Sequence, residues 1–154
     1  MNIHIREATL DDLPVLLNFE QELIAVERPM DPSLVKDRKI NYYDIGAFIK
    51  SKDAEVFVAL LNNEIVGSGY GLIKQHPPKH LHKTYGHIGF IFVQDSHRGK
   101  GISKLILNRI FEWFKTKNII EVKLQVYDKN PSAIKAYEKV GFEKNLIEML
   151  YYLK

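Results

Sequence analysis

The sequence predicts a single-domain α/β protein in which a mixed, mostly antiparallel sheet of six to seven strands carries helices on both faces. Three observations predict this fold class. Apolar residues alternate in short strand-like runs, they recur at helical spacing in longer segments, and no linker or repeat divides residues 1–154. A chain of 154 residues is also long enough to bury one sizeable core.

The N-terminal third is expected to hold one strand and two helices. Residues 2–7 alternate as a half-buried strand does. Thr9 or Asp11 then caps a helix whose apolar residues recur at helical spacing. The segment 27–32 contains two prolines and breaks this helix, and a weaker helical stretch is expected within 33–50.

An antiparallel hairpin is expected next. Residues 55–61 and 64–73 are strand-like, and the pair Asn62-Asn63 between them readily adopts positive φ. Two prolines make residues 75–83 a loop, because they remove backbone donors and hold the chain extended.

The C-terminal half alternates strands and helices. Residues 85–93 predict a strand, 99–117 a strongly amphipathic helix, and 119–127 a further strand. A helix over 130–141 begins with asparagine and proline and stops at a glycine. The segment 142–153 predicts one or two more strands.

Composition excludes several classes of function. Without cysteine there is no disulfide, no thiolate metal site and no cysteine nucleophile. No apolar run approaches the ~18 residues of a membrane span, and the acids near the N-terminus are unlike a secretion signal, so we expect a cytoplasmic protein without a membrane partner. A net charge of +3 is small for a nucleic-acid binder, so no nucleic-acid partner is expected.

The most informative segment is a turn between a strand and an amphipathic helix, Arg98-Gly99-Lys100-Gly101-Ile102-Ser103. Small residues let the backbone turn sharply, so several N–H groups stay unpaired at the positive end of the helix dipole, where a pyrophosphate can bind. Arg98, Lys100 and Lys104 add positive charge. The turn is neither a P-loop nor a dinucleotide fingerprint. The alternative to phosphate binding is that this segment is an ordinary glycine-rich turn whose lysine side chains are solvated.

This turn resembles motif A of the GNAT superfamily of N-acetyltransferases, Q/R-x-x-G-x-G/A, although Ser103 replaces the usual final glycine or alanine. Val93, five residues before Arg98, matches the family's strand valine. A second segment is similar to the family pattern N-x-x-A-x-x-x-Y-x-x-x-G-F; it consists of Asn130-Pro131-Ser132-Ala133, Tyr137 and Gly141-Phe142. The resemblance implies a GNAT fold over residues 1–154 and acetyl-CoA as co-substrate.

The resemblance assigns the donor site mostly to the main chain. Ile91 would present its N–H to the thioester oxygen, and Val93 would pair with the pantetheine arm where a bulge separates two strands. Asn130 would cap its helix and also meet the pantetheine. The implied cofactor-binding residues are Ile91, Phe92, Val93, Arg98, Gly99, Lys100, Gly101, Ile102, Ser103, Lys104, Asn130, Ala133 and Tyr137.

Three side chains are candidates for proton transfer. The family places a tyrosine hydroxyl at Tyr137 as general acid, whereas helical spacing alone favours core packing. His87 stands six residues before Val93, where some members carry a catalytic glutamate. Glu20 lies on the apolar face of the first helix, so it either pairs with a core arginine or lysine or faces the acceptor cleft. Deprotonation through ordered water, with no single base, is the alternative.

The expected reaction is direct transfer of acetyl to a primary amine in a ternary complex, since no acetyl-cysteine can form. Candidate acceptor contacts are Glu20, Glu27, Arg28, Tyr42, Tyr43 and Asp44. The acids among them favour a cationic acceptor such as a polyamine, a lysine side chain or a protein N-terminus. A non-catalytic acetyl-CoA sensor or partner-binding module is the alternative, and a homodimer is left open.

Two further groups are interpreted as structural. His76, His80 and His82 are separated by prolines that prevent a convergent register, so we expect a solvated loop and no metal site. Trp113 and Phe114 continue the apolar stripe of their helix with Phe111 nearby, which indicates core packing and not a stacking platform.

Overall fold

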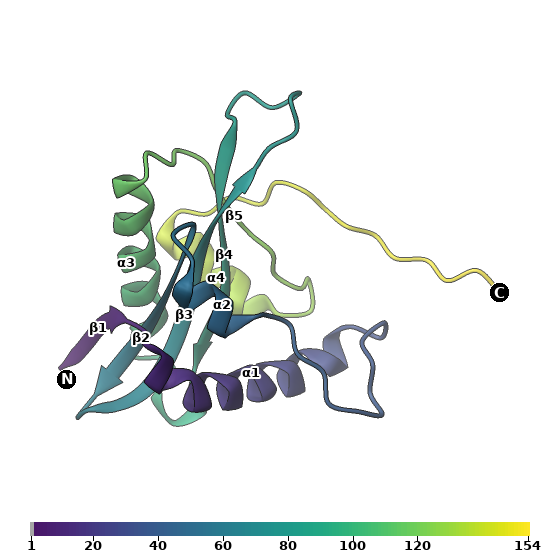
Figure 1. The fold of residues 1–154 in the computed structure, drawn as a ribbon. Coiled ribbons are helices and arrows are strands. Elements are labelled where there is room, and N and C mark those ends of the chain that lie inside the picture. The colour runs from purple at the N-terminus through teal and green to yellow at the C-terminus, as the bar shows by residue number, and fades with distance from the viewer. Residues whose placement is uncertain (1) are drawn as a thin grey trace.

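A five-stranded sheet forms the centre of this computed structural model, which describes residues 2–154 (Figure 1). The strand order is β1-β2-β3-β4-β5. Neighbouring strands are antiparallel except for the last pair, in which β5 runs parallel to β4. The strands are β1 Ile3–Glu7, β2 Ala54–Leu61, β3 Glu64–Gln75, β4 Thr84–Val93 and β5 Val122–Leu124.

Helices cover both faces of this sheet. Within residues 2–154 they are α1 Leu13–Glu27, α2 Ile45–Lys50, α3 Ile102–Thr116 and α4 Pro131–Val140, with short 3-10 turns at Leu10–Asp12, Arg28–Met30 and Asp95–His97. Residues of α1 and α2 share one buried apolar cluster with the sheet, and residues of α3 share the other. A mixed sheet between two helical layers confirms the predicted fold class.

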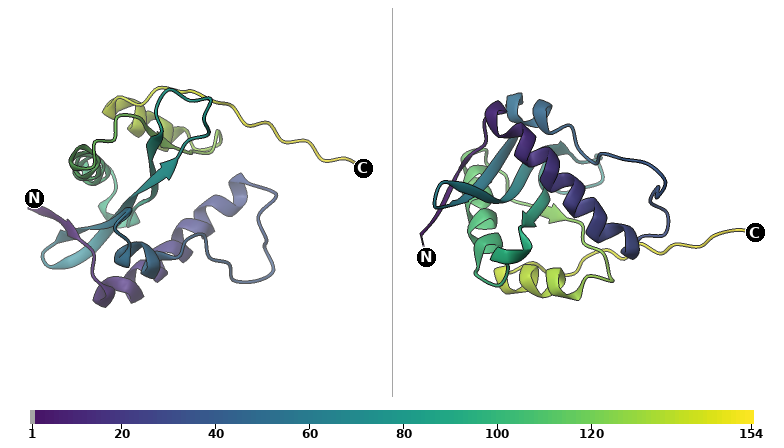
Figure 2. Two further views of the ribbon diagram at one scale, coloured as in Figure 1. Left: turned by 45° about the horizontal axis from the view of Figure 1, so that its top comes forward. Right: turned by 90° about the horizontal axis from the view of Figure 1, so that it is seen from below.

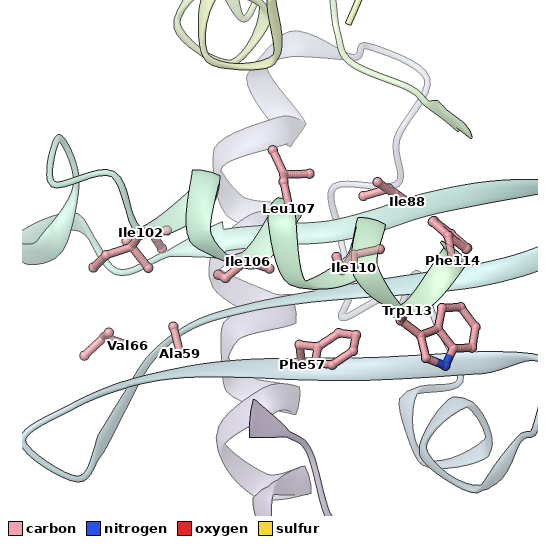
Figure 3. Close-up of a cluster of buried hydrophobic side chains, with 11 residues drawn as sticks. Phe57, Ala59, Val66, Ile88, Ile102, Ile106, Leu107, Ile110, Trp113 and Phe114 are labelled. Carbon is pink, nitrogen blue, oxygen red and sulfur yellow. The ribbon is translucent and has the colours of Figure 1, made fainter. Parts of the chain in front are cut away.

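The core beneath α3 holds that helix close to the sheet. Ile106, Ile110 and Phe114 of α3 are buried in one cluster with Phe57 of β2 (Figure 3). A glycine in β3 permits the close approach, because a Cβ atom at Gly69 would lie 2.7 Å from Ile106 Cγ2. The start of α3, where the sequence predicts phosphate binding, is therefore fixed to the sheet by packing.

The hairpin is confirmed, and its turn has the expected conformation. Asn62 and Asn63 join β2 to β3 with φ values of 52° and 65°. Asparagine tolerates this left-handed region better than most residues, since its short polar side chain bonds locally.

Three expected elements are shorter or absent, and the absence of any strand after residue 142 leaves five strands in the described residues where six or seven were expected. Only Val122–Leu124 of the expected strand 119–127 pairs with β4. The expected helix within 33–50 is confined to Ile45–Lys50. Residues 142–154 form no strand, because they extend away from the body of the molecule without a neighbouring strand (Figures 1 and 2). A strand requires a hydrogen-bonded partner as well as a suitable apolar pattern.

Candidate active site

The strands β4 and β5 diverge at the centre of the candidate site. They pair only at Gly86, His87 and Ile88, whereas β4 continues to Val93. Beyond Ile88 the β5-facing edge of β4 therefore has no strand partner within residues 2–154. This edge without a strand partner contains Ile91, Phe92 and Val93, the residues that the family resemblance assigns to thioester and pantetheine binding.

A bulge in β4 accompanies the divergence. Phe90 has φ of 59°, and the register with β3 shifts between Ser68 and Tyr70. The hydroxyl of Ser68, which is fully buried, donates to the Phe90 carbonyl at 3.1 Å and holds the bulge in place. A positive φ at a bulky aromatic residue is a strained conformation that the surrounding packing must maintain.

The turn after β4 leaves a row of backbone donors free. Gly99 and Gly101 have φ values of 76° and 79°. Across residues 99–104, no backbone N–H donates to an atom of the described chain, and the first bond of α3 runs from Leu105 N to Gly101 O at 3.3 Å. A Cβ atom at either glycine would meet nothing within 4 Å, so the space beside these donors is open.

These features fit a diphosphate. Six unpaired N–H groups lie at the positive end of the 15-residue helix α3, and Lys100 and Lys104 are exposed beside them. Arg98 also has partners within the chain, since its Nε donates to Val93 O at 3.0 Å and its Nη1 pairs with Asp95 at 3.0 Å. The Arg98 guanidinium therefore braces the turn against the end of β4.

Helix α4 presents Tyr137 to the interior. Asn130 caps the helix, because its side chain accepts from Ala133 N at 3.2 Å. Burial, with a smaller contribution from the negative charge of Glu27, raises the pKa of Tyr137 to about 12. The Tyr137 phenol is therefore protonated at neutral pH.

Glu27 belongs to a polar group that joins the end of α1 to the segment after β5. Tyr127 Oη donates to Asp31 Oδ2 at 2.7 Å, a contact between residues 96 apart in the sequence. Burial raises the pKa of Glu27, the nearby Tyr42 hydroxyl partly opposes this effect, and the charge of Asp31 adds to it. The Tyr42 hydroxyl is buried, and its distance and angles to neighbouring groups within residues 2–154 do not meet those of a hydrogen bond. The negative charge of Glu27 is nevertheless close enough to contribute to the raised pKa of Tyr42. The group thus retains unused hydrogen-bonding capacity.

Glu20 is buried and fully engaged, which differs from both sequence expectations. Its partners are neither arginine nor lysine, because it accepts from Asn41 Nδ2 at 3.1 Å and from the backbone N–H groups of Tyr42 and Tyr43 at 2.9 and 2.8 Å. The carboxylate is therefore occupied in holding the 41–43 loop. It positions Tyr42, and this engagement argues against Glu20 as the general base.

His87 lies on β4 with its ring 6.0 Å from that of Tyr70. Burial, followed by the charge of Lys74, lowers the pKa of His87 to about 4. The ring is neutral at pH 7 but is a very weak base. This environment argues against the base role that the sequence suggested for His87.

Several other candidate contacts have structural partners. Arg28 donates to Arg38 O at 2.7 Å, and Asp44 caps α2 by accepting from Ala47 N at 3.2 Å. Tyr43 packs against Tyr70 and Phe90, with ring centroids 5.2 and 5.4 Å apart. Of the proposed acceptor contacts, Tyr42 Oη and Arg28 Nε are buried without a hydrogen-bond partner among the described residues, and the Glu27 carboxylate lies near the Tyr42 hydroxyl.

The histidine loop is attached to β4 and to the chain just before β5. His76 Nε2 contacts Glu121 Oε2 at 2.6 Å, and the His76 ring stacks on His80 with centroids 4.1 Å apart. No cluster of three or more histidine, cysteine, aspartate or glutamate side chains suited to a metal occurs in the described residues. Trp113 and Phe114 lie in the α3 core with Phe111 packed against it. No helix within residues 2–154 has the length and apolarity required to cross a membrane.

Sequence reasoning missed Asp31 and Tyr127, and it expected a bulge near Val93 only through the family resemblance, without placing it at Phe90. The Asp31–Tyr127 contact joins distant segments, so no local spacing signals it. Glycine or asparagine would have indicated a positive φ, but phenylalanine does not.

Curated proteins with similar sequences are N-acetyltransferases by name. An N-alpha-acetyltransferase from Saccharolobus solfataricus is 28% identical over 156 positions, which cover 96% of this chain and 84% of that protein. Its counterpart from Sulfurisphaera tokodaii is 29% identical over the same shares of the two chains.

Solved structures share the fold over nearly the whole chain. A predicted acetyltransferase from Clostridium acetobutylicum, crystallised with acetyl-CoA, superposes with a TM-score of 0.72 at 19% identity and covers 97% of this chain and 96% of its own. A mutant of the BH1408 protein from Bacillus halodurans reaches a TM-score of 0.88 at 22% identity, over 98% of this chain and 99% of that one.

The family assignment follows from a match that spans the site just described. The profile of the acetyltransferase (GNAT) family matches residues 19–142, from the middle of α1 through the turn at 98–104 to the end of α4. Members of this family use acetyl-CoA as co-substrate. The open donors before α3, the divergence of β4 and β5, and this match lead to one conclusion: the chain belongs to the acetyltransferase (GNAT) family.

Proposed function

We propose that this chain is an N-acetyltransferase that transfers an acetyl group directly from acetyl-CoA to a primary amine. One observation carries the proposal. The free donors of residues 99–104 and the unpaired edge of β4 are contiguous, because Arg98 bonds the end of β4 to the turn at 3.0 Å. A ligand with a diphosphate at one end and an extended arm at the other matches this arrangement.

The donor side is assigned as follows. The N–H groups of Gly99–Lys104 hold the pyrophosphate of acetyl-CoA, with Lys100 and Lys104 adding charge. The main chain of Ile91, Phe92 and Val93 lies along the pantetheine arm, and Asn130 and Ala133 of α4 border it. Acetyl-CoA supplies an acetyl group activated as a thioester. The Ile91 N–H stabilises the negative charge that develops on the carbonyl oxygen.

Tyr137 is assigned as the general acid. Its raised pKa keeps the phenol protonated at neutral pH, so the hydroxyl carries the proton that the departing sulfur needs. As the carbon–sulfur bond breaks, Tyr137 donates this proton to the sulfur. The apolar packing of the ring against Phe142, 6.0 Å away between centroids, holds the hydroxyl in place.

Glu27 is assigned as the acceptor-side carboxylate, in place of Glu20 and His87. Burial raises its pKa, so it is a stronger base than an exposed carboxylate. It first pairs with the ammonium form of the acceptor and then receives a proton, directly or through water. The neutral amine nitrogen forms its new bond to the acetyl carbon, and the second proton that this nitrogen then loses passes through water to the Tyr137 oxygen, which restores the phenol after it has protonated the sulfur. The unpartnered Tyr42 hydroxyl provides a further hydrogen bond to the amine.

The α-amino group of a peptide is the first acceptor to test. Its pKa of ~8 leaves a substantial neutral fraction at pH 7, whereas a lysine side chain with a pKa of ~10.4 requires a much stronger base. A site with one carboxylate base suits the less basic amine. The name N-alpha-acetyltransferase, which two relatives with 28% and 29% identity carry, supports the same choice.

The test combines coenzyme A release with mass spectrometry over three acceptors. They are a peptide with a free N-terminus, the same peptide with a blocked N-terminus and an internal lysine, and a polyamine. We expect acetylation of the first peptide, a fall in kcat of about 10²-fold or more for Tyr137→Phe, and little change for the matched variant Tyr85→Phe. Binding of acetyl-CoA without turnover on any of these amines would refute the enzyme and favour a sensor.

A further inference from the structure

One face of the sheet is uncovered where β3 ends and β4 begins. Helices α1 and α2 pack against this face through an apolar cluster whose last member on β3 is Leu72. Beyond Leu72 the hairpin of β3 and β4 extends past both helices (Figure 1). The proposed donor and acceptor contacts make no use of this part of the sheet.

Four side chains from three strands share the uncovered face. The strand register places Lys74 of β3 opposite Tyr85 of β4, and His87 of β4 opposite Lys123 of β5. Because side chains alternate along a strand, Tyr85 and His87 lie on one face, and the Lys123 Nζ lies 4.7 Å from the centre of the Tyr85 ring. We call Lys74, Tyr85, His87 and Lys123 the cationic face.

The cationic face carries positive charge that its neighbours do not balance. Lys74 is exposed and forms no ion pair with another described residue. Glu121 lies 3.8 Å from Lys123, but it also contacts His76 Nε2 at 2.6 Å. After burial, the charge of Lys74 is what lowers the pKa of His87, so the potential at this ring is positive. A ligand with several negative charges is favoured on such a surface.

The surface is also held in a fixed shape. The His76 side chain is 2% exposed, and its ring packs on Tyr85 with centroids 4.3 Å apart and stacks on His80 at 4.1 Å. The Tyr85 ring is therefore fixed by His76 as well as by Lys123. A preformed surface loses little conformational freedom when a ligand binds.

We propose, building on the proposed function, that the cationic face binds acidic side chains of the acceptor polypeptide, downstream of its amino terminus. In the proposed reaction the amine attacks beside the Ile91 N–H, and β4 leads from there to the cationic face. A strand rises ~3.3 Å per residue, so His87 lies roughly 13 Å and Tyr85 roughly 20 Å from Ile91 along β4. An extended acceptor covers these distances in about four and six residues, which brings about its fifth to seventh residues to Lys123 and Lys74.

The size of the effect follows from exposed ion pairs. Each such pair contributes up to about 5-fold in affinity at low salt. Pairs at Lys74 and Lys123 together should favour a suitably acidic acceptor by about 5- to 20-fold. Both lie far from the reacting bond, so they stabilise the bound acceptor and its transition state equally. The preference therefore appears in KM and not in kcat, and added salt weakens it.

The test uses three peptides with the same free N-terminus that differ only in the position of two glutamates. The glutamates occupy the second and fourth, the fifth and seventh, or the tenth and twelfth residues. We expect the lowest KM for the second of these peptides, at similar kcat. Lys74→Glu should abolish this advantage. Lys115→Glu, the same charge change at an exposed position of α3 on the opposite face of the sheet, is the matched control and should retain it.

A second variant and a second measurement complete the test. Lys123→Gln removes a charge without placing a new one beside Glu121, and it should reduce the advantage by about 2- to 5-fold. Fluorescence anisotropy of dye-labelled peptides measures docking without turnover. If no peptide is acetylated, but the second still binds most tightly and Lys74→Glu removes this difference, the proposed function alone fails.

The proposal has clear contrary outcomes. Equal KM values and equal affinities for the three peptides would overturn it, as would an unchanged preference in Lys74→Glu. A single-stranded oligonucleotide that binds the native chain more tightly than any peptide, and loses affinity in Lys74→Glu, would identify a nucleic-acid site and would also overturn it.

Discussion

Replacing Gly101 by alanine tests the role of the turn before α3. Gly101 has φ of 79°, and a Cβ atom there would meet nothing within 4 Å, so backbone strain is the only expected effect. An alanine in the left-handed region costs about 1–2 kcal/mol. The exposed turn relaxes to avoid this cost in the free protein, but the bound state requires the original conformation.

The strain should therefore appear in ligand affinity. A penalty of about 1–2 kcal/mol weakens coenzyme A binding by roughly 5- to 30-fold. Isothermal titration calorimetry measures this change, and urea unfolding measures stability in parallel. We expect the free energy of unfolding of Gly101→Ala to fall by less than about 1 kcal/mol.

Gly141→Ala is the matched control. Gly141 also has a positive φ, 118°, with nothing within 4 Å of a Cβ atom, but its N–H donates to Tyr137 O and Glu138 O at the end of α4. Folding requires that conformation, so this variant should lose about 1–2 kcal/mol of stability and keep its affinity for coenzyme A. The reasoning is refuted if Gly101→Ala binds coenzyme A as tightly as the native chain.

Three further predictions concern the titratable groups. Glu27→Gln should lower kcat/KM for the amine by about 10²-fold and remove the acidic limb of the pH–rate profile, and a retained limb would exclude Glu27 as the base. Glu20→Gln should lower the free energy of unfolding in urea by about 2–4 kcal/mol, because an amide cannot accept all three hydrogen bonds. The same variant should change kcat only a few-fold. A large fall in kcat with unchanged stability would restore Glu20 as a catalytic candidate. His87 has a pKa of about 4 in the folded chain and ~6.5 in the unfolded chain. Above pH 6.5 the ring is neutral in both states, so His87 does not lower the free energy of unfolding. As the pH falls toward 4 the unfolded chain takes up the proton first, and the free energy of unfolding falls by about 3 kcal/mol at most. Urea unfolding at several pH values should therefore show a weaker acid dependence for His87→Gln than for the native chain, and identical dependences would contradict the buried, neutral His87.

Local sequence determined the elements whose conformation depends on nearby residues. The glycines at 99 and 101, the asparagine pair at 62–63 and the asparagine-proline start of α4 predicted their turns and caps, because φ preferences and caps act within a few residues. The same locality makes the proposed phosphate-binding turn recognisable from the sequence.

Tertiary structure decided which polar groups are free. The sequence placed Glu20 on an apolar helix face, but only the fold shows that the 41–43 loop saturates it and leaves Glu27 available. The low pKa of His87 likewise results from burial between segments, and residue type gives no sign of it.

Strand pairing between segments that are distant in the sequence was also beyond local prediction. Residues 142–153 have the apolar pattern of a strand, and that expectation was wrong for the single chain because no neighbouring strand pairs with them. The bulge at Phe90 depends on the buried Ser68 hydroxyl, and Tyr127 meets Asp31 across 96 positions. Such contacts join distant segments, so spacing along the chain does not encode them; they exist only once the whole fold has brought those segments together.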